Sequence, residues 1–469
     1  MPAKAGIQAP GRQTTPSVVS PAGASCGLPR LCVTMPLMSS SSRWRKIIPG
    51  VLLAAFSIAF SVLLLEGGVR LLRLAPPAEG TGWFWRVPDP QTGWSLQPGA
   101  SGRWFNPQVE YDVEVAINSN GLRDIERATL AKPDDVFRIL LLGDSYVEGL
   151  RVPLEQTFGK TLEARLNADG LASQRIEVIP AGVSGWGTDQ ELLWLREYGA
   201  AYQPDLVLLA FFPGNDFQNN SETLEVENMG SVQKPFFHLE NGEPVLRYFP
   251  FDPAAVAQPA ETTTPSDNTG DSRPVLSPVA AWLKQHSALY RFAGPALAGG
   301  APDLARSLAD RGLLERGLLR GDTSDEYIPV AYGVYRAPLS DDWTNSVELT
   351  GALIGEMRTQ AKMLGASLAA VIVTAPEQVY PDRWQQRLDD NPAMAAYTWD
   401  LEQPNRLAAD LFLRAGIRYL DLLPAFRERA EAGALLHLRH DGHWTPAGEQ
   451  LAGEATAEFL VEQNLVPEQ

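Results

Sequence analysis

Cysteine is nearly missing from this sequence, and the little there is lies at one end. Among 469 residues the two cysteines are Cys26 and Cys32, so the chain beyond them has no thiol for a disulfide or a thiolate zinc site. Basic residues are also few, 39 Lys and Arg against 56 Asp and Glu, which gives a net charge of −17. Because that charge repels phosphate, we expect no nucleic acid as a main partner.

Charged residues are missing from one stretch near the N-terminus, Ile47 to Leu65. Its 19 residues, as a helix, are about long enough to cross the hydrocarbon core of a bilayer. Three basic residues precede it (Arg43, Arg45 and Lys46), so the positive-inside tendency places the chain after Glu66 outside the cell or in the periplasm. We expect a single-pass anchor in the inner (cytoplasmic) membrane. A cleaved signal peptide is the alternative, but the run is long for one and no A-x-A site follows it.

Beyond this segment, apolar runs of strand length alternate with stretches of helical spacing. We predict strands over 136–142, 176–179, 206–212, 367–373 and 417–420, and helices over 157–166, 189–198, 347–364, 403–416 and 446–460. Apolar strands that alternate with helices form a parallel sheet covered on both faces. The predicted fold class is therefore α/β, a three-layer α/β/α sandwich around a five-stranded, flavodoxin-like parallel sheet, preceded by the transmembrane helix.

Other parts of the chain lack this alternation. Residues 1–42 are predicted to be a disordered tail, 43–74 the membrane anchor with its flanks, and 75–134 an aromatic, turn-rich lead-in with no assignable chemistry. The α/β domain is predicted over 135–465, with an insertion at about 220–340 that includes a solvated low-complexity loop. The insertion also contains a helix around Trp282 and Tyr290, whose rings we expect to pack internally. A lid or a membrane-proximal role is the less favoured alternative.

Four motifs are expected to meet at one edge of the sheet. Gly143-Asp144-Ser145 ends the first strand, AGVSGWGT with Gly185 follows the second, and FFPGNDF with Asn215 follows the third. RHDGHWTPAG, with His443, stands just before the last helix. Each is common turn chemistry, and a serine at such a corner is often only a helix N-cap. Their joint placement at strand ends, where α/β proteins bind ligands, predicts a functional site.

Together these motifs resemble those of the SGNH, or GDSL-type, hydrolase superfamily, over roughly residues 135–220 and 341–460. Acyl transfer needs a nucleophile, a base, a group that orients the base, and donors to the developing oxyanion. The resemblance implies Ser145 as nucleophile and His443 as base. It implies an oxyanion hole made by the backbone N–H groups of Ser145 and Gly185 and the side-chain amide of Asn215.

The histidine motif departs from the family's usual Asp-x-x-His pattern. Asp441 stands two positions before His443, and His440 three positions before it. Some relatives that act in polysaccharide O-acetylation have Asp-x-His, and DGHWTPAG is similar to that form. We predict that Asp441, and not His440, orients His443, because a carboxylate stabilises an imidazolium far better than a second imidazole does. Asp144 and Asp216 are expected to be turn and supporting residues.

The cluster of His437, His440, Asp441 and His443 raises a metal site as an alternative. No further His or Cys pattern supplies other ligands, so neither a metal nor another cofactor is expected. His238 and His286, both in the insertion, are expected to be surface or packing residues.

The sequence therefore predicts an SGNH-type serine esterase that cleaves an acyl ester, and first of all an acetyl ester, through an acyl-enzyme. An acylated envelope carbohydrate is the first choice of substrate, because the anchor places the site beside such polymers. An O-acyltransferase would differ only in using a sugar hydroxyl to resolve the acyl-enzyme. A non-catalytic envelope-assembly or carbohydrate-binding protein is the third alternative, although a binding module does not need this set of residues.

Overall fold

The computed structural model describes residues 41–72, 85–105, 110–168, 173–229, 231–252, 277–314 and 328–467. The predicted tail lies outside these residues except for its last two, and so does nearly all of the predicted low-complexity loop. The chain divides into two compact units, Met1–Leu63 and Leu64–Gln469. Helix α1 (Ser41–Leu71) is the described part of the first unit and runs into the second.

Helix α1 contains the predicted apolar run. Within the described residues, its segment Leu52–Leu71 is the one stretch long and apolar enough, by length and composition, to cross a membrane. This segment reaches six residues beyond Leu65 and includes Glu66 and Arg70, which pair with each other on the helix with Nε and Oε1 2.6 Å apart. An ion pair one turn apart lets the helix continue through two charged positions.

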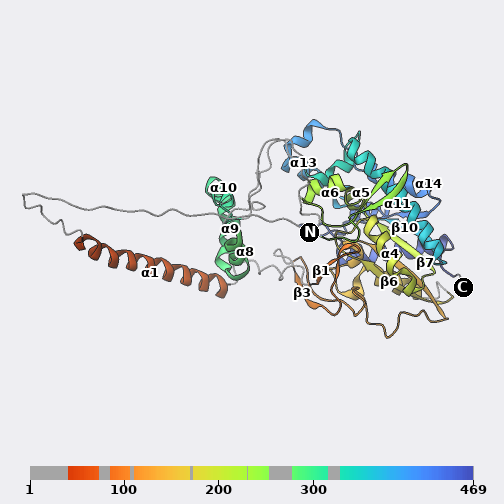
Figure 1. Cartoon of the computed structure of the whole chain (residues 1–469), viewed down its shortest axis with the longest axis horizontal. Coiled ribbons are helices and arrows are strands. Elements are labelled where there is room, and N and C mark those ends of the chain that lie inside the picture. Colours follow the sequence, from red (N-terminus) through yellow and green to blue (C-terminus); the bar gives the residue numbers. More distant parts are fainter. Residues whose placement is uncertain are drawn as a thin grey trace, which may run out of the picture. The chain divides into compact units, whose positions relative to one another are not determined.

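A five-stranded parallel sheet forms the centre of the second unit (Figure 1). Its strands are β5 (Val136–Gly143), β6 (Arg175–Gly182), β7 (Leu206–Phe211), β10 (Ser367–Ile372) and β11 (Arg418–Asp421). They lie in the order β11-β10-β7-β5-β6, and every neighbouring pair is parallel. This is the flavodoxin-like order, and the predicted fold class is confirmed.

Helices cover both faces of this sheet. One layer contains α4 (Thr188–Tyr202), α11 (Asp341–Met363) and α14 (Gln403–Arg414). The other layer contains α3 (Phe158–Asn167), α15 (Leu423–Glu431) and α16 (Pro446–Glu462). Successive strand residues enter opposite cores, as Leu140 and Leu141 do, because side chains alternate across a strand. Both faces of the strands are therefore apolar, which explains the unbroken hydrophobic runs in the sequence.

Shorter elements surround the three layers. The lead-in forms two antiparallel hairpins, β1 (Arg86–Asp89) with β2 (Gly93–Leu96) and β3 (Ser101–Phe105) with β4 (Asp112–Ala116). The remaining elements are α2 (Ser145–Glu148), η1 (Leu154–Gln156), α5 (Pro213–Asn220), α6 (Glu222–Met229), β8 (Phe236–Glu240), β9 (Glu243–Arg247), η3 (Val330–Tyr335), α12 (Pro376–Val379), α13 (Pro381–Asp390) and η4 (Pro392–Ala396).

The described part of the insertion also contains the helices α8 (Ser277–His286), α9 (Ala288–Gly300) and α10 (Pro302–Asp310). The single helix predicted here is broken at Ser287, whose Oγ accepts a hydrogen bond from the Tyr290 backbone N–H and so caps α9. Tyr290 packs as expected, with its hydroxyl donating to the Leu313 carbonyl. The packing prediction is wrong for Trp282, which is 59% exposed and stacks on His286.

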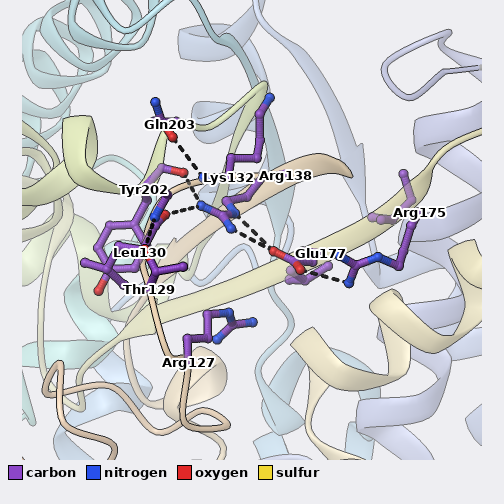
Figure 2. A network of polar contacts seen from close by, with 12 residues as sticks. Arg127, Thr129, Leu130, Lys132, Arg138, Arg175, Glu177, Tyr202 and Gln203 are labelled. Atoms are coloured by element: carbon purple, nitrogen blue, oxygen red, sulfur yellow. Dashed lines mark hydrogen bonds and ion pairs between the residues drawn. The ribbon is translucent and has the colours of Figure 1, made fainter. Parts of the chain in front are cut away.

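A network of hydrogen bonds and ion pairs lies near the amino ends of β5 and β6 (Figure 2). The Arg138 guanidinium, buried within the sheet, pairs with Glu177 at 2.8 Å. It also donates to the carbonyls of Leu130 and Tyr202, each at 2.7 Å. A buried guanidinium is tolerated only when its donors are paired, so this end of the sheet is structural. The polar motifs lie at the opposite end.

Candidate active site

Ser145 lies at the corner between β5 and α2. The Asp144 carboxylate accepts a hydrogen bond from the Tyr146 backbone N–H at 2.9 Å and caps the short helix α2. Gly143 is required just before it, because a Cβ there would lie 2.4 Å from Val147 Cγ2. The strand therefore ends in a tight turn that presents the half-buried Ser145 at the carboxyl edge of the sheet.

The structure brings Ser145, His443 and Asp441 together. His443 Nε2 lies 2.7 Å from Ser145 Oγ, and His443 Nδ1 lies 2.5 Å from Asp441 Oδ1. Ser145 and His443 are 298 positions apart in the chain. The two nitrogens of one imidazole thus connect a hydroxyl with a carboxylate, the arrangement in which the ring can take a proton from the hydroxyl.

The charges around His443 set its protonation state. Burial lowers the pKa of His443 and the nearby charge of Arg151 lowers it further, while the hydrogen bond and the charge of Asp441 raise it. The net pKa lies below the ordinary value, so the ring is neutral at pH 7 and able to accept a proton. Burial raises the pKa of Asp441, but its bond with His443, the charge of His443 when protonated and the charge of Arg151 outweigh burial and hold it well below the usual range.

Asp441 has two further partners that the sequence analysis missed. Arg151 Nε lies 3.1 Å from its Oδ1 and Arg151 Nη2 3.3 Å from its Oδ2. The Tyr111 hydroxyl donates to Oδ2 at 3.2 Å. These contacts fix the carboxylate so that one oxygen faces the imidazole.

Two of the predicted oxyanion residues, Gly185 and Asn215, are connected through hydrogen bonds of Asn219. Asn215 Nδ2 donates to the Asp144 carboxylate at 2.8 Å and approaches the Trp186 carbonyl at 3.4 Å. Asn219, a residue that the sequence analysis did not single out, donates to the Gly185 carbonyl at 2.9 Å and to Asn215 Oδ1 at 3.0 Å. Gly185 has a φ of +80°, a left-handed conformation that favours glycine.

Two supporting carboxylates lie beneath these loops. Burial raises the pKa of Asp144 to about 6, against the lowering effect of its bonds from Tyr146 and Asn215. Asp216 is buried and accepts hydrogen bonds from the Thr188 hydroxyl and the Phe212 backbone N–H, each at 2.7 Å. Both residues hold turns together, as expected, and neither is hydrogen bonded to His443.

The lead-in supports the loop that carries Asp441 and His443. The Glu110 carboxylate accepts hydrogen bonds from three successive backbone N–H groups, those of Arg439 at 2.6 Å and of His440 and Asp441 at 3.1 Å each. His440 itself is exposed, and its contact with Glu110 is through the backbone. The carboxylate thus holds in place the residues that lead into Asp441.

The lead-in also supports the loop that carries Gly185. Trp85 Nε1 donates to the buried Glu148 carboxylate at 3.0 Å, and the same carboxylate accepts from the Ser184 backbone at 2.7 Å. Trp94 Nε1 donates to the Ser184 carbonyl at 3.2 Å, and Trp186 Nε1 to the Trp94 carbonyl at 3.0 Å. The density of aromatic residues in 75–134 was the one sequence signal of this role.

The other histidines lie apart from Ser145. His437 is buried, with Nε2 near the Thr374 hydroxyl and carbonyl, and burial lowers its pKa to about 3. His238 pairs with Glu222 at the surface, and His286 stacks on Trp282. Within the described ranges no three His, Cys, Asp or Glu side chains are grouped so that they could hold a metal ion.

A cavity of about 280 Å³ opens beside His443. Its lining combines the aromatic rings of Phe212, Tyr332 and Tyr335 with polar groups. The polar lining includes Asn215 and an ion pair between Arg387 and Glu377, with Nε and Oε1 2.9 Å apart. The site is therefore a concave one, lined by the candidate base His443 and the candidate oxyanion donor Asn215.

Comparisons with known proteins agree with the motifs. Residues 339–469 match the family described as the SGNH hydrolase-like domain of the acetyltransferase AlgX. This range includes Asp441 and His443. It begins after Ser145, Gly185 and Asn215, which therefore lie outside the match. No curated protein sequence matches the chain.

The solved structures that this chain is similar to include esterases and an acylhydrolase. The lipase/acylhydrolase from Enterococcus faecalis is 14% identical, with 70% of this chain and 96% of that chain covered and a TM-score of 0.31. The acetyl xylan esterase AlAXEase is 11% identical over 69% and 98%, with a TM-score of 0.31. A catalytic mutant of Axe2, an acetylxylan esterase from Geobacillus stearothermophilus, is 11% identical over 69% and 94%, with a TM-score of 0.30. The predicted resemblance to the SGNH hydrolase superfamily is confirmed by the family match over residues 339–469, and the strand order of the sheet agrees with it.

Proposed function

We propose that this protein is a serine esterase of the SGNH type that cleaves an acyl ester, and first of all an acetyl ester, through an acyl-enzyme at Ser145. The observation that carries the proposal is the hydrogen-bonded series Ser145, His443 and Asp441, with distances of 2.7 and 2.5 Å. A serine that only caps a helix has no need of a histidine and a carboxylate in line with it.

The proposed reaction has two halves. Ser145 Oγ attacks the ester carbonyl carbon while its proton passes to His443 Nε2, and the imidazolium is stabilised by Asp441. The ester C–O bond then breaks, and the leaving alcohol takes the proton from His443. In the second half, water loses a proton to His443 and attacks the acyl carbon. The acid is released and the proton returns to Ser145 Oγ.

The proposed oxyanion donors are the backbone N–H groups of Ser145 and Gly185 and the amide of Asn215. Asn215 Nδ2 carries two hydrogens, one of which is bonded to Asp144 at 2.8 Å. The other is directed at the Trp186 carbonyl oxygen, which lies 3.4 Å from Nδ2, so that this contact is weak. We propose that this second hydrogen turns to the oxyanion. Loss of one such donor costs about 2.7–4 kcal/mol of transition-state stabilisation.

The proposed substrate is an acylated carbohydrate of the cell envelope. The apolar segment Leu52–Leu71 supports a membrane anchor, and the basic residues before it support an orientation with the second unit outside or in the periplasm. The cavity of about 280 Å³ beside His443 has room for a short acyl group and part of its alcohol. Its polar lining of Asn215, Glu377 and Arg387 suits hydroxyl-rich ligands.

An O-acyltransferase is the second candidate. The observation that favours it is the match of residues 339–469 to a family whose description names an acetyltransferase. In that case a sugar hydroxyl takes the place of water in the second half-reaction, with the same residues. A non-catalytic carbohydrate-binding protein remains the alternative of another class.

The test is turnover of a chromogenic acetyl ester by the full chain in detergent, with and without a polysaccharide acceptor. Release of chromophore in water alone favours the esterase, and acceptor-dependent release with acetylated polysaccharide favours the transferase.

Ser145→Ala should lower either activity by several orders of magnitude with thermal unfolding unchanged. Ser231→Ala, at an exposed serine, is the matched control. Full activity of Ser145→Ala would refute the serine mechanism, and carbohydrate binding without turnover would favour a binding protein.

A further inference from the structure

Glu66 is a charged residue inside the apolar segment Leu52–Leu71, five positions before its end. Three of its hydrogen-bond donors come from the insertion. Oε1 accepts from the Ala288 backbone at 2.9 Å, and Oε2 accepts from the Ser287 hydroxyl and the Leu289 backbone at 2.8 Å each. A carboxylate near the hydrocarbon region is tolerated when its oxygens are paired, and the start of α9 supplies this pairing.

Arg70 adds a second connection at the same place. Its Nε donates to Glu66 Oε1 at 2.6 Å, and its Nη2 donates to the His286 carbonyl at 2.5 Å. His286 is the last residue of α8. The end of α8 and the start of α9 are therefore both hydrogen bonded to the last two turns of α1.

This attachment sets the level of the α8–α9 junction relative to a bilayer. Five residues of helix rise by about 7.5 Å, so Glu66 lies within that distance of the end of the apolar segment at Leu71. Where α1 crosses a membrane, the junction at Ser287 lies at the boundary between hydrocarbon and headgroups.

Large apolar side chains are exposed on all three of the helices α8, α9 and α10. Val279 and Trp282 are 46% and 59% exposed, and lie three residues apart on one face of α8. Phe292 on α9 and Leu304 on α10 are 42% and 51% exposed. Trp282 and Phe292 are each five residues from Ser287, which is again about 7.5 Å along a helix. Aromatic side chains exposed at this level are typical of helices that lie in the membrane interface.

We propose that α8–α10 form a membrane-surface module whose exposed side chains, Val279, Trp282, Phe292 and Leu304, insert into the interface of the bilayer that α1 crosses. The proposal rests on the proposed anchor and on continuity with it, since the hydrogen bonds to Glu66 and Arg70 hold the junction at the outer end of α1. The insertion then gives the chain a second point of attachment to the bilayer. One membrane helix leaves an attached domain free to rotate, whereas two points of contact restrict that rotation.

The test uses the full chain with Cys26→Ser and Cys32→Ser, so that a single new cysteine takes an environment-sensitive fluorophore. Trp282→Cys and Phe292→Cys place the label in the module, and Leu413→Cys is the control, since Leu413 is 65% exposed on α14. The labelled chains are reconstituted into phosphatidylethanolamine/phosphatidylglycerol vesicles with and without lipids that carry a nitroxide near the headgroup. We expect blue-shifted emission at 282 and 292, with at least three times the nitroxide quenching seen at 413.

Glu66→Leu tests the attachment itself. It removes the acceptor of three α9 donors while keeping α1 apolar, so the chain should still float with vesicles while quenching at 282 falls at least twofold. Equal quenching at 282 and 413 in chains that float overturns the membrane-surface module and leaves the anchor standing. Blue-shifted emission without quenching by nitroxide lipids shows that protein covers the face, which also overturns it. Chains that do not float refute the anchor, and the module with it. Esterase turnover, measured on the same vesicles, reports separately on the proposed function.

Discussion

Asp441 shows how an Asp-x-His spacing can bring a carboxylate onto the ring of the histidine that follows it. The residue between them, Gly442, has a φ of +86°, a left-handed conformation that side chains resist. It folds the loop back so that Asp441 Oδ1 reaches both the His443 ring at 2.5 Å and the His443 backbone N–H at 3.3 Å. Arg151 and Tyr111 fix the carboxylate from the other side. Two positions therefore suffice where the family usually has three.

We predict that Asp441→Asn lowers kcat about 10⁴-fold, as loss of the orienting carboxylate does in other triads, because an amide can hold the ring in the wrong tautomer. His440→Gln should lower kcat less than threefold, because the exposed His440 side chain is not part of the hydrogen-bonded series. The measurement is steady-state turnover of an acetyl ester across pH 5–9. Equal and small effects of both substitutions would mean that His443 works as a dyad with Ser145.

The sequence carried enough information to predict which residues form the candidate site, because each lies in a short motif at a strand or loop end. These residues are Ser145, Gly185, Asn215, Asp441 and His443. The structure brings all five to one edge of the sheet, and their chemical roles remain predictions. Arg151, Tyr111 and Glu110 were missed for a physical reason. They contact residues 439–441 across 290 to 331 positions of chain, and a long-range contact between common residue types leaves no local pattern.

At the scale of elements, the lead-in is the main finding beyond the predicted α/β fold. Its strands belong to two short hairpins outside the parallel sheet, and their apolar side chains join the core beside α4 and α11. Trp94 donates to the loop of Gly185, and Trp85 donates to Glu148, whose carboxylate also accepts from that loop. Glu110 and Tyr111 bond the loop of His443. One segment thus supports the two sides of the candidate site.

We predict that Glu110→Gln lowers kcat about tenfold with a small effect on KM. Three hydrogen bonds to a charged acceptor are weakened, and a hydrogen bond to a charged group is worth about 1.5–3 kcal/mol. Part of that loss appears as misplacement of Asp441, and about 1.4 kcal/mol in the barrier is tenfold in rate. Glu114→Gln, at an exposed position of β4, is the control. The measurement is steady-state kinetics of both variants. Equal kcat values for Glu110→Gln and Glu114→Gln would show that Glu110 does not contribute to catalysis.

Element boundaries show where sequence patterns stop being informative. Strands β5, β7 and β10 were predictable because most of their residues are buried, so their apolar runs are close to the strands in length. Strand β6 extends from Arg175 to Gly182, beyond the predicted 176–179. The break between α8 and α9 was missed because it depends on Ser287 as a cap and on Glu66, 221 positions away, as acceptor. Trp282 was predicted to be packed because apolar spacing alone does not distinguish a core from a lipid-facing surface.

At the scale of the whole molecule, buried carboxylates connect elements that are far apart in the sequence. Glu449, in the first turn of α16, is buried and accepts a hydrogen bond from the Phe158 backbone N–H at the start of α3. Burial raises the pKa of Glu449 to about 8, although the bond from Phe158 and the charges of Arg123 and Arg151 oppose the shift. Burial raises the pKa of Asp144 in the same way, to about 6. The folded protein therefore binds protons that the unfolded chain has already lost.

The pH dependence of stability follows from this difference, and Glu449→Gln isolates one contribution. Between the ordinary pKa of about 4.5 and the folded value of about 8, the unfolded chain has ionised Glu449 while the folded protein keeps its proton. Each unit of pH in that interval lowers the free energy of unfolding by about 1.4 kcal/mol through this group. The substituted amide keeps an oxygen for the Phe158 N–H and cannot ionise. The free energy of unfolding of Glu449→Gln should therefore rise by about 2–3 kcal/mol relative to that of the parent between pH 5 and pH 7.

Denaturant unfolding at both pH values measures this, with Glu458→Gln on the exposed side of α16 as control. A stability difference that stays the same at both pH values would show that Glu449 is ionised in the folded protein and paired with the arginines.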